Sequence, residues 1–222
     1  LWPMADGLGI PALALVILAT VWMTNLYNFM DGSDGLAGGM ALIGFAAFGA
    51  GAWLAGDSGF AVLNFSVAAS ALAFLLFNFH PARIFMGDAG SIPLGFLAAV
   101  LGVQGWQRGL WPAWFPALVF SPFIVDASVT LLRRLARRER VWRAHREHYY
   151  QRLVQMGWGH RGTALAEYAV MLAAAAGALW GARQAPGWQA ALTAVWIVAY
   201  LLIAAGIDRG WKRFAAQGGG SR

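Results

Sequence analysis

Two short polar stretches occur in this apolar chain of 222 residues, each at the end of an apolar run. The first is NLYNFMDGSDGLA at residues 25–37, and the second is FMGDAGS at residues 85–91. They contain Asp31, Asp34 and Asp88, three of the ten acidic residues. Carboxylates are costly near hydrocarbon, so these three are candidates for function. The adjacent glycines let the backbone come close to a ligand, which suits a divalent cation and a phosphate.

The spacing within the first stretch favours a shared helical face. Asn25 and Asn28 are three residues apart, as are Asp31 and Asp34, and positions i and i+3 share one face of a helical turn. Asn28 and Asp31 are therefore predicted to project into one polar cleft. For Asp34 alone, capping of a helix that starts near residue 36 is an equal alternative.

In the second stretch, Ser91 is predicted to cap a helix, and Pro93 is predicted to lie in its first turn. Free amides at a helix start favour an anion. Asp88 beside them would repel a bare phosphate but would accept one that carries Mg²⁺. The alternative is a tight turn with a polar cap.

A third stretch, residues 133–153, is strongly basic. If it is helical, His145, His148 and Arg152 lie along one face. Arginine and protonated histidine bind phosphate, and neutral histidine can act as a base. A zinc site is the alternative for the two histidines. A solvated loop over anionic lipid accounts for most of the arginines, namely Arg133, Arg134, Arg137, Arg138 and Arg140.

Three further polar residues have open roles. Asp126 lies about two turns, roughly 10 Å, before Arg133 in the same apolar run. It either lines the cleft or pairs with an asparagine or arginine of a neighbouring helix. His80 and His160 are interpreted as loop residues rather than ligands.

The composition indicates a membrane protein. Hydrophobic residues make up 59% of the chain, charged residues only 12%, and mean hydropathy is +0.57, whereas soluble chains are about 25% charged. There is no cysteine, which excludes disulfides and thiolate metal sites. Apolar runs of about 17–25 residues span a bilayer as helices. Seven are predicted, at residues 10–29, 37–55, 60–79, 91–107, 113–132, 163–183 and 188–207. We therefore expect an all-α, polytopic transmembrane helical bundle, with its glycine-rich second helix closely packed.

The basic residues are distributed unevenly between the two ends of this bundle. Only Arg108 and Arg183 fall on one side, and the other fourteen lysines and arginines fall on the side that holds all three polar stretches. This bias predicts that the side with the fourteen basic residues is cytoplasmic. Nucleic acid is not expected as a partner, because no aromatic-rich soluble module accompanies the arginines. We interpret residues 1–222 as one membrane-embedded domain, with 133–162 as a cytoplasmic, basic, histidine-containing loop.

The three stretches together resemble the polyprenyl-phosphate N-acetylhexosaminyl-1-phosphate transferase family. The matching patterns are NxxNFMDGxDGLA from Asn25, FMGDxGS from Phe85 and HRxHxYQRL from His145, in the family's order. The wording of the first pattern is closest to the enzymes that initiate O-antigen synthesis.

The resemblance implies transfer of an N-acetylhexosamine 1-phosphate from a UDP-sugar to undecaprenyl phosphate in the inner membrane, with release of UMP. It implies Mg²⁺ as the cofactor, with Mn²⁺ as an alternative. A homodimer is one oligomeric arrangement that the sequence leaves open.

The resemblance also implies roles for individual residues. Asp88 is expected to be the principal metal ligand, assisted by Asn28 or Asp31, and Asp31 is expected near the pyrophosphate. Asp34 and Phe85 are expected to contact uridine. The remaining expected catalytic or substrate-binding residues are Asn25, Gly87, His145, Arg146, His148 and Arg152.

Two departures from the family matter. First, the family's N-terminal helices are absent, and the adjacent pair of aspartates that they carry occurs nowhere in this sequence. Second, the histidine stretch reads HRxHxYQ instead of the run of histidines found in the peptidoglycan enzyme. We therefore expect a C-terminal part of a longer transferase, inactive by itself. The competing hypotheses are a transporter or flippase of a lipid-linked or anionic solute, and an inactive fragment with a structural role.

Overall fold

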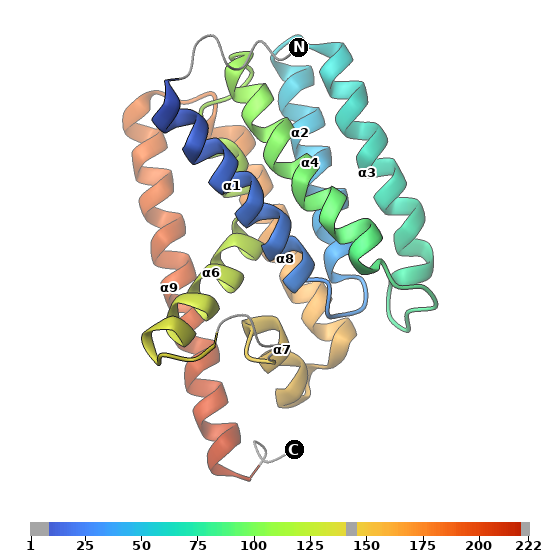
Figure 1. Ribbon diagram of the computed structural model, residues 1–222, viewed down its shortest axis with the longest axis vertical. Coiled ribbons are helices and arrows are strands. Elements are labelled where there is room, and N and C mark those ends of the chain that lie inside the picture. The colour runs from blue at the N-terminus through green and yellow to red at the C-terminus, as the bar shows by residue number, and fades with distance from the viewer. Residues whose placement is uncertain (1–8, 141–145, 219–222) are drawn as a thin grey trace.

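The computed structural model describes residues 9–140 and 146–218, and the regular elements in this part of the chain are all helices (Figure 1). The predicted all-α class is therefore confirmed. In chain order the elements are α1 (Ile10–Phe29), α2 (Leu36–Leu54), α3 (Ser58–Asn78), α4 (Gly87–Gln107), α5 (Trp114–Val119), α6 (Ser121–Ala136), α7 (Tyr149–Leu153), a π-helical turn (Val154–Trp158), α8 (Gly159–Gly181) and α9 (Pro186–Ala216).

Six helices within the described residues are long and apolar enough to cross a membrane, which confirms a multi-pass helical bundle. The prediction of seven single spans was wrong at the fifth, residues 113–132. That run is divided at Phe120 into α5 and α6, each too short to span alone. Pro122 at the start of α6 explains the break, since proline cannot donate a helical hydrogen bond.

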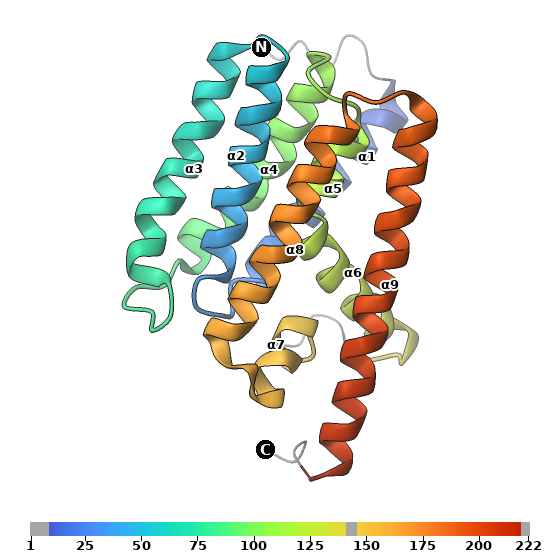
Figure 2. The same cartoon turned by 180° about the vertical axis from the view of Figure 1, so that it is seen from behind.

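Although this span is divided, the connections between helices still alternate between the two ends of the bundle, as predicted. Figures 1 and 2 show that α5 and α6 together lead from one end of the bundle to the other, as a single helix would. The connections 30–35 and 79–86 therefore lie at the same end as α7. The region 133–162 was predicted as a loop, but it contains the end of α6, α7 and the π-helical turn.

The start of α4 differs from the prediction. The helix begins at Gly87, four residues before Ser91, so Ser91 is not its N-cap and Pro93 lies inside the helix. Gly87 has a φ of 57°, a left-handed conformation that favours glycine. This early start places Asp88 in the first turn of α4.

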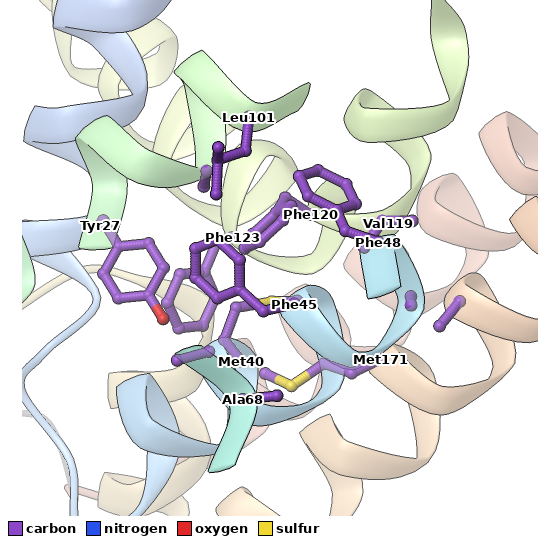
Figure 3. Packing of buried hydrophobic residues seen from close by; sticks show 14 of the residues in the cluster. Tyr27, Met40, Phe45, Phe48, Ala68, Leu101, Val119, Phe120, Phe123 and Met171 are labelled. Carbon is purple, nitrogen blue, oxygen red and sulfur yellow. The ribbon is translucent and has the colours of Figure 1, made fainter. Parts of the chain in front are cut away.

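Helix α2 is the packed centre of the bundle. Phe45 and Phe48 on α2 meet Phe120 edge to face, with ring centroids 5.8 and 5.4 Å apart (Figure 3). A Cβ atom added to Gly44 would lie 2.5 Å from the Phe120 ring, and one on Gly49 would lie 2.6 Å from Phe65. The predicted close packing of the glycine-rich helix is confirmed, because these rings occupy the space that side chains would need.

Candidate active site

Asn28, near the end of α1, contacts the first turn of α4. Its Nδ2 donates to Oδ1 of Asp88 at 2.7 Å and to Oγ of Ser91 at 2.9 Å. The first two polar stretches, 60 residues apart at these positions, are thus in direct contact. In this orientation Asn28 presents its amide nitrogen and so orients Asp88, while its role as a metal ligand stays a prediction.

Asp31 lies two residues beyond the end of α1 and is partly buried. The pKa of its carboxyl is raised to about 6, mainly by burial. A hydrogen bond from the Gly87 amide acts in the opposite direction and lowers this pKa, while the negative charge of Asp88 raises it further. Within the described residues, neither carboxylate forms a salt bridge. Two neighbouring carboxylates without a basic partner favour a bound cation.

The donor set fits Mg²⁺ better than a metal held by protein alone. The described part of the chain contains no group of three or more acidic or histidine side chains that could hold a metal. Mg²⁺ is commonly bound by one or two carboxylates, with phosphate oxygens and water completing its shell. Asp31 and Asp88 are the residues that would hold it.

Asp126 organises the third polar stretch. Its carboxylate is 6% exposed and accepts hydrogen bonds from the amides of Tyr149 and Tyr150 at 2.9 and 3.0 Å. The Nδ1 atom of His148 lies 3.2 Å from its Oδ1, and so does the Oγ1 atom of Thr130. Asp126 therefore holds the start of α7, a role that differs from both sequence interpretations.

The predicted helical face of the third stretch was wrong. Residues 146–148 precede α7, and His148 is its N-cap, buried at 1% exposure. His145 lies outside the described residues. Arg152 donates to Asp208 of α9 at 3.0 Å, while Arg146 is exposed.

The interpretation of the arginines as a solvated loop was also wrong for two of them. Arg133 and Arg134 belong to α6, and Arg134 is 5% exposed. Arg133 pairs with Asp208 at 2.9 Å, and Arg134 pairs with Glu139 at 2.9 Å. The first ion pair ties α6 to α9, and the second ties α6 to the turn that follows it.

Asp34 connects the first stretch to the 79–86 loop instead of capping α2. The N-cap of α2 is Gly35, and no side chain caps this helix. The Oδ2 atom of Asp34 accepts from Nδ1 of His80 at 2.7 Å and from the amide of Ala82 at 3.2 Å. Phe85, in the same loop, is 77% exposed and therefore accessible to a ligand.

Asn25 is another predicted site residue that the structure does not bring into contact with Asp88. It is exposed, and its Nδ2 donates to the carbonyl of Val21 at 2.8 Å in its own helix.

Sequence reasoning missed two residues that join these segments. Asn78 is 3% exposed, accepts from the Gly35 amide at 3.0 Å and donates to the Ile84 carbonyl at 2.9 Å. Tyr150 donates to the Phe29 carbonyl at 3.2 Å, which joins α7 to the end of α1. For Asn78, its position at the end of an apolar run is a sequence signal. Tyr150 is the tyrosine of the pattern that begins at His145, but no role was predicted for it.

An apolar cavity of about 210 Å³ lies between α1, α4, α5 and α6. Its lining includes Trp22 and Leu26 of α1, Val103 of α4, and Phe120. Its lining extends from Leu26 and Ala98 to Trp106 and Ala113, toward the end of the bundle opposite Asp88.

Comparisons with known proteins point to one class of enzyme. Residues 5–105 match the family model described as glycosyl transferase family 4. A probable undecaprenyl-phosphate N-acetylglucosaminyl 1-phosphate transferase of Bacillus subtilis is 34% identical over 165 residues, which are 73% of this chain and 46% of that protein. A phospho-N-acetylmuramoyl-pentapeptide-transferase of Levilactobacillus brevis is 47% identical over 88 residues, 40% of this chain and 27% of that protein. The corresponding transferase of Anoxybacillus flavithermus is 30% identical over 168 residues, 74% of this chain and 50% of that protein. The chain thus spans half or less of the length of these relatives.

Proposed function

Since residues 5–105 of the chain belong to glycosyl transferase family 4, we propose that the protein transfers an N-acetylhexosamine 1-phosphate from a UDP-sugar to undecaprenyl phosphate. The products are a lipid-linked diphospho-sugar and UMP. In this proposal the reaction occurs at the cytoplasmic face of the inner membrane and initiates O-antigen or another cell-envelope polysaccharide. The observation that carries it is the contact of Asn28 with Asp88, 2.7 Å apart, beside Asp31.

Asp31 and Asp88 would hold Mg²⁺, which supplies charge neutralisation of the pyrophosphate and stabilisation of the departing UMP. Asn28 keeps the Asp88 carboxylate oriented, because it donates to one of its oxygens and is itself fixed by Ser91. The exposed Phe85 ring offers a face on which uracil can stack. Arg146, also exposed, is available to a phosphate oxygen.

His148 contributes in a different way from that expected of a phosphate ligand. It is buried, and its ring stacks near Phe29 with centroids 6.3 Å apart. Together with Asp126 it supports the α7 start, and Tyr150 then braces the end of α1 beside the carboxylates.

The apolar cavity supports a lipid acceptor. Its lining is almost entirely aliphatic and aromatic, and such surface gains free energy when it covers an isoprenoid chain. A polyprenyl tail in this cavity would lead toward the Asn28 end of α1, where its phosphate would meet the carboxylates.

Release of UMP from UDP-N-acetylglucosamine, in membranes that contain undecaprenyl phosphate and the full gene product, tests the proposal. Asp88→Asn is expected to reduce Mg²⁺-dependent release at least about 100-fold, since it removes one of the two charged carboxylates that would hold Mg²⁺ against the reacting phosphates. The matched control, Asp57→Asn, changes an aspartate in the connection between α2 and α3 at the opposite end of the bundle and should stay within about threefold. Near-normal release by Asp88→Asn would overturn the assignment, and solute flux without UDP-sugar consumption would favour the transport hypothesis.

A further inference from the structure

Three segments of the candidate site meet at a pair of stacked histidines. The rings of His80, in the 79–86 loop, and His160, at the start of α8, have centroids 5.9 Å apart and planes 19° apart. Nδ1 of His80 donates to Oδ2 of Asp34 at 2.7 Å. Nδ1 of His160 shares a 2.8 Å hydrogen bond with Oγ of Ser33. The two rings therefore attach a loop and a helix to adjacent residues of the turn before α2.

The loop is held to this turn at several points. Oδ2 of Asp34 also accepts from the Ala82 amide at 3.2 Å, so the ring and the backbone of the loop share one carboxylate oxygen. Burial would raise the pKa of Asp34, but the hydrogen bonds from His80 and Ala82 and the nearby His160 hold it below its ordinary value. The other oxygen, Oδ1, has no hydrogen-bond partner in the described residues.

Helix α8 holds the turn from the other side. Ser33 is 9% exposed, so loss of His160 would leave a largely buried hydroxyl without its partner. Two turns further along α8, Tyr168 donates to the Gly35 carbonyl at 2.6 Å. His160 is therefore the part of α8 that reaches both the turn and the ring of His80.

We propose that His80 and His160 are positioning residues, which keep Asp34 and the loop that carries Phe85 in a fixed relative placement. The stacked pair links α8 to that loop through side chains alone. The inference rests on the proposed function in one respect, namely that Asp34 and Phe85 bind the uridine part of a UDP-sugar. The proposal assigns His80 and His160 no contact with the reacting groups.

Loop mobility tests the positioning role without any ligand. The chain contains no cysteine, so Arg83→Cys, an exposed loop position, can carry a single nitroxide label in lipid nanodiscs. His160→Ala and His80→Ala are each expected to add a mobile component to the spectrum, and Ser33→Ala should do the same. His160→Phe, which keeps a ring but loses the hydrogen bond, should have a smaller effect.

Two controls make this result specific. Arg161→Ala changes the exposed neighbour of His160 and should leave the spectrum unchanged. A label at Ala55, at the opposite end of the bundle, should not respond to any of the histidine variants. An unchanged Arg83 label in both His80→Ala and Ser33→Ala would overturn the proposal, even if His160→Ala failed to fold.

Binding of UMP in the presence of Mg²⁺, measured by calorimetry, tests the consequence for the site. His160→Ala is expected to weaken binding about tenfold, which corresponds to about 1.4 kcal/mol. If the full gene product without substitutions binds no UMP, the proposed function fails and the label alone decides the positioning role. If it binds UMP and the histidine variants bind equally well, the positioning role is refuted.

Discussion

Replacement of Asp126 by alanine should detach α7 from the bundle. The carboxylate accepts from two backbone amides at 2.9 and 3.0 Å and lies 3.2 Å from the His148 ring nitrogen and the Thr130 hydroxyl. Hydrogen bonds to a charged group contribute about 1.5–3 kcal/mol each. They are not additive, and removal of one partner from a buried charged network costs about 3–5 kcal/mol.

The cost should be concentrated at the start of α7. The amides of Tyr149 and Tyr150 lose their acceptors, while the rest of the bundle keeps its apolar packing. We therefore expect hydrogen exchange in residues 146–153 to accelerate by about 100-fold or more, since about 1.4 kcal/mol is a factor of ten. Asp126→Asn keeps an acceptor oxygen and should show a smaller acceleration.

Hydrogen exchange followed by mass spectrometry gives this readout peptide by peptide. Peptides from α3 serve as an internal reference, because none of the hydrogen bonds to Asp126 in the described residues comes from this helix. If residues 146–153 exchange equally slowly in Asp126→Ala and in the unmodified protein, Asp126 does not hold α7 and the reasoning is refuted.

Three further predictions follow from other parts of the molecule. Phe85→Ala should raise KM for the UDP-sugar about tenfold with little change in kcat, because base stacking on an exposed ring contributes about 1–3 kcal/mol; steady-state UMP release measures both. Gly44→Ala should destabilise the protein by about 1–3 kcal/mol by crowding Phe120, seen as a lower thermal midpoint, whereas a Cβ at Gly206 meets nothing within 4 Å and Gly206→Ala should not lower it. The pKa of Asp34 is lower in the folded protein than its ordinary value of 3.8, so its ionised carboxylate stabilises the fold above about pH 3.8, and this stabilisation is lost as pH falls through the lower folded pKa. His80→Ala should raise the folded pKa of Asp34, which nuclear magnetic resonance of its carboxyl carbon measures.

The apolar runs could be located from the sequence because a bilayer imposes a local requirement. Each spanning segment must pair its own backbone groups and present apolar side chains over its whole length, and both properties are visible in a window of about twenty residues. Helices α1, α2 and α3 accordingly start and end close to the predicted positions. The break at Phe120 was missed because residues 113–132 were interpreted as one span, without weight given to Pro122 as the start of a new helix.

The candidate site was predictable in part. Asn28, Asp31 and Asp88 were singled out because carboxylates and amides near hydrocarbon need a reason, and the structure brings these side chains together. The placement of His148 was not predictable, since its burial depends on Asp126, 22 residues earlier and in a different helix.

The sequence by itself determined that the chain is a helical membrane protein and that its polar stretches gather at one end, because hydrocarbon selects residues by type and run length. Only the tertiary structure decided which polar groups meet. The contacts of His80 with Asp34 and of His160 with Ser33 join positions 46 and 127 residues apart. Such partners are chosen by the packing of helices against one another, and that packing has no signature in any local stretch of the chain.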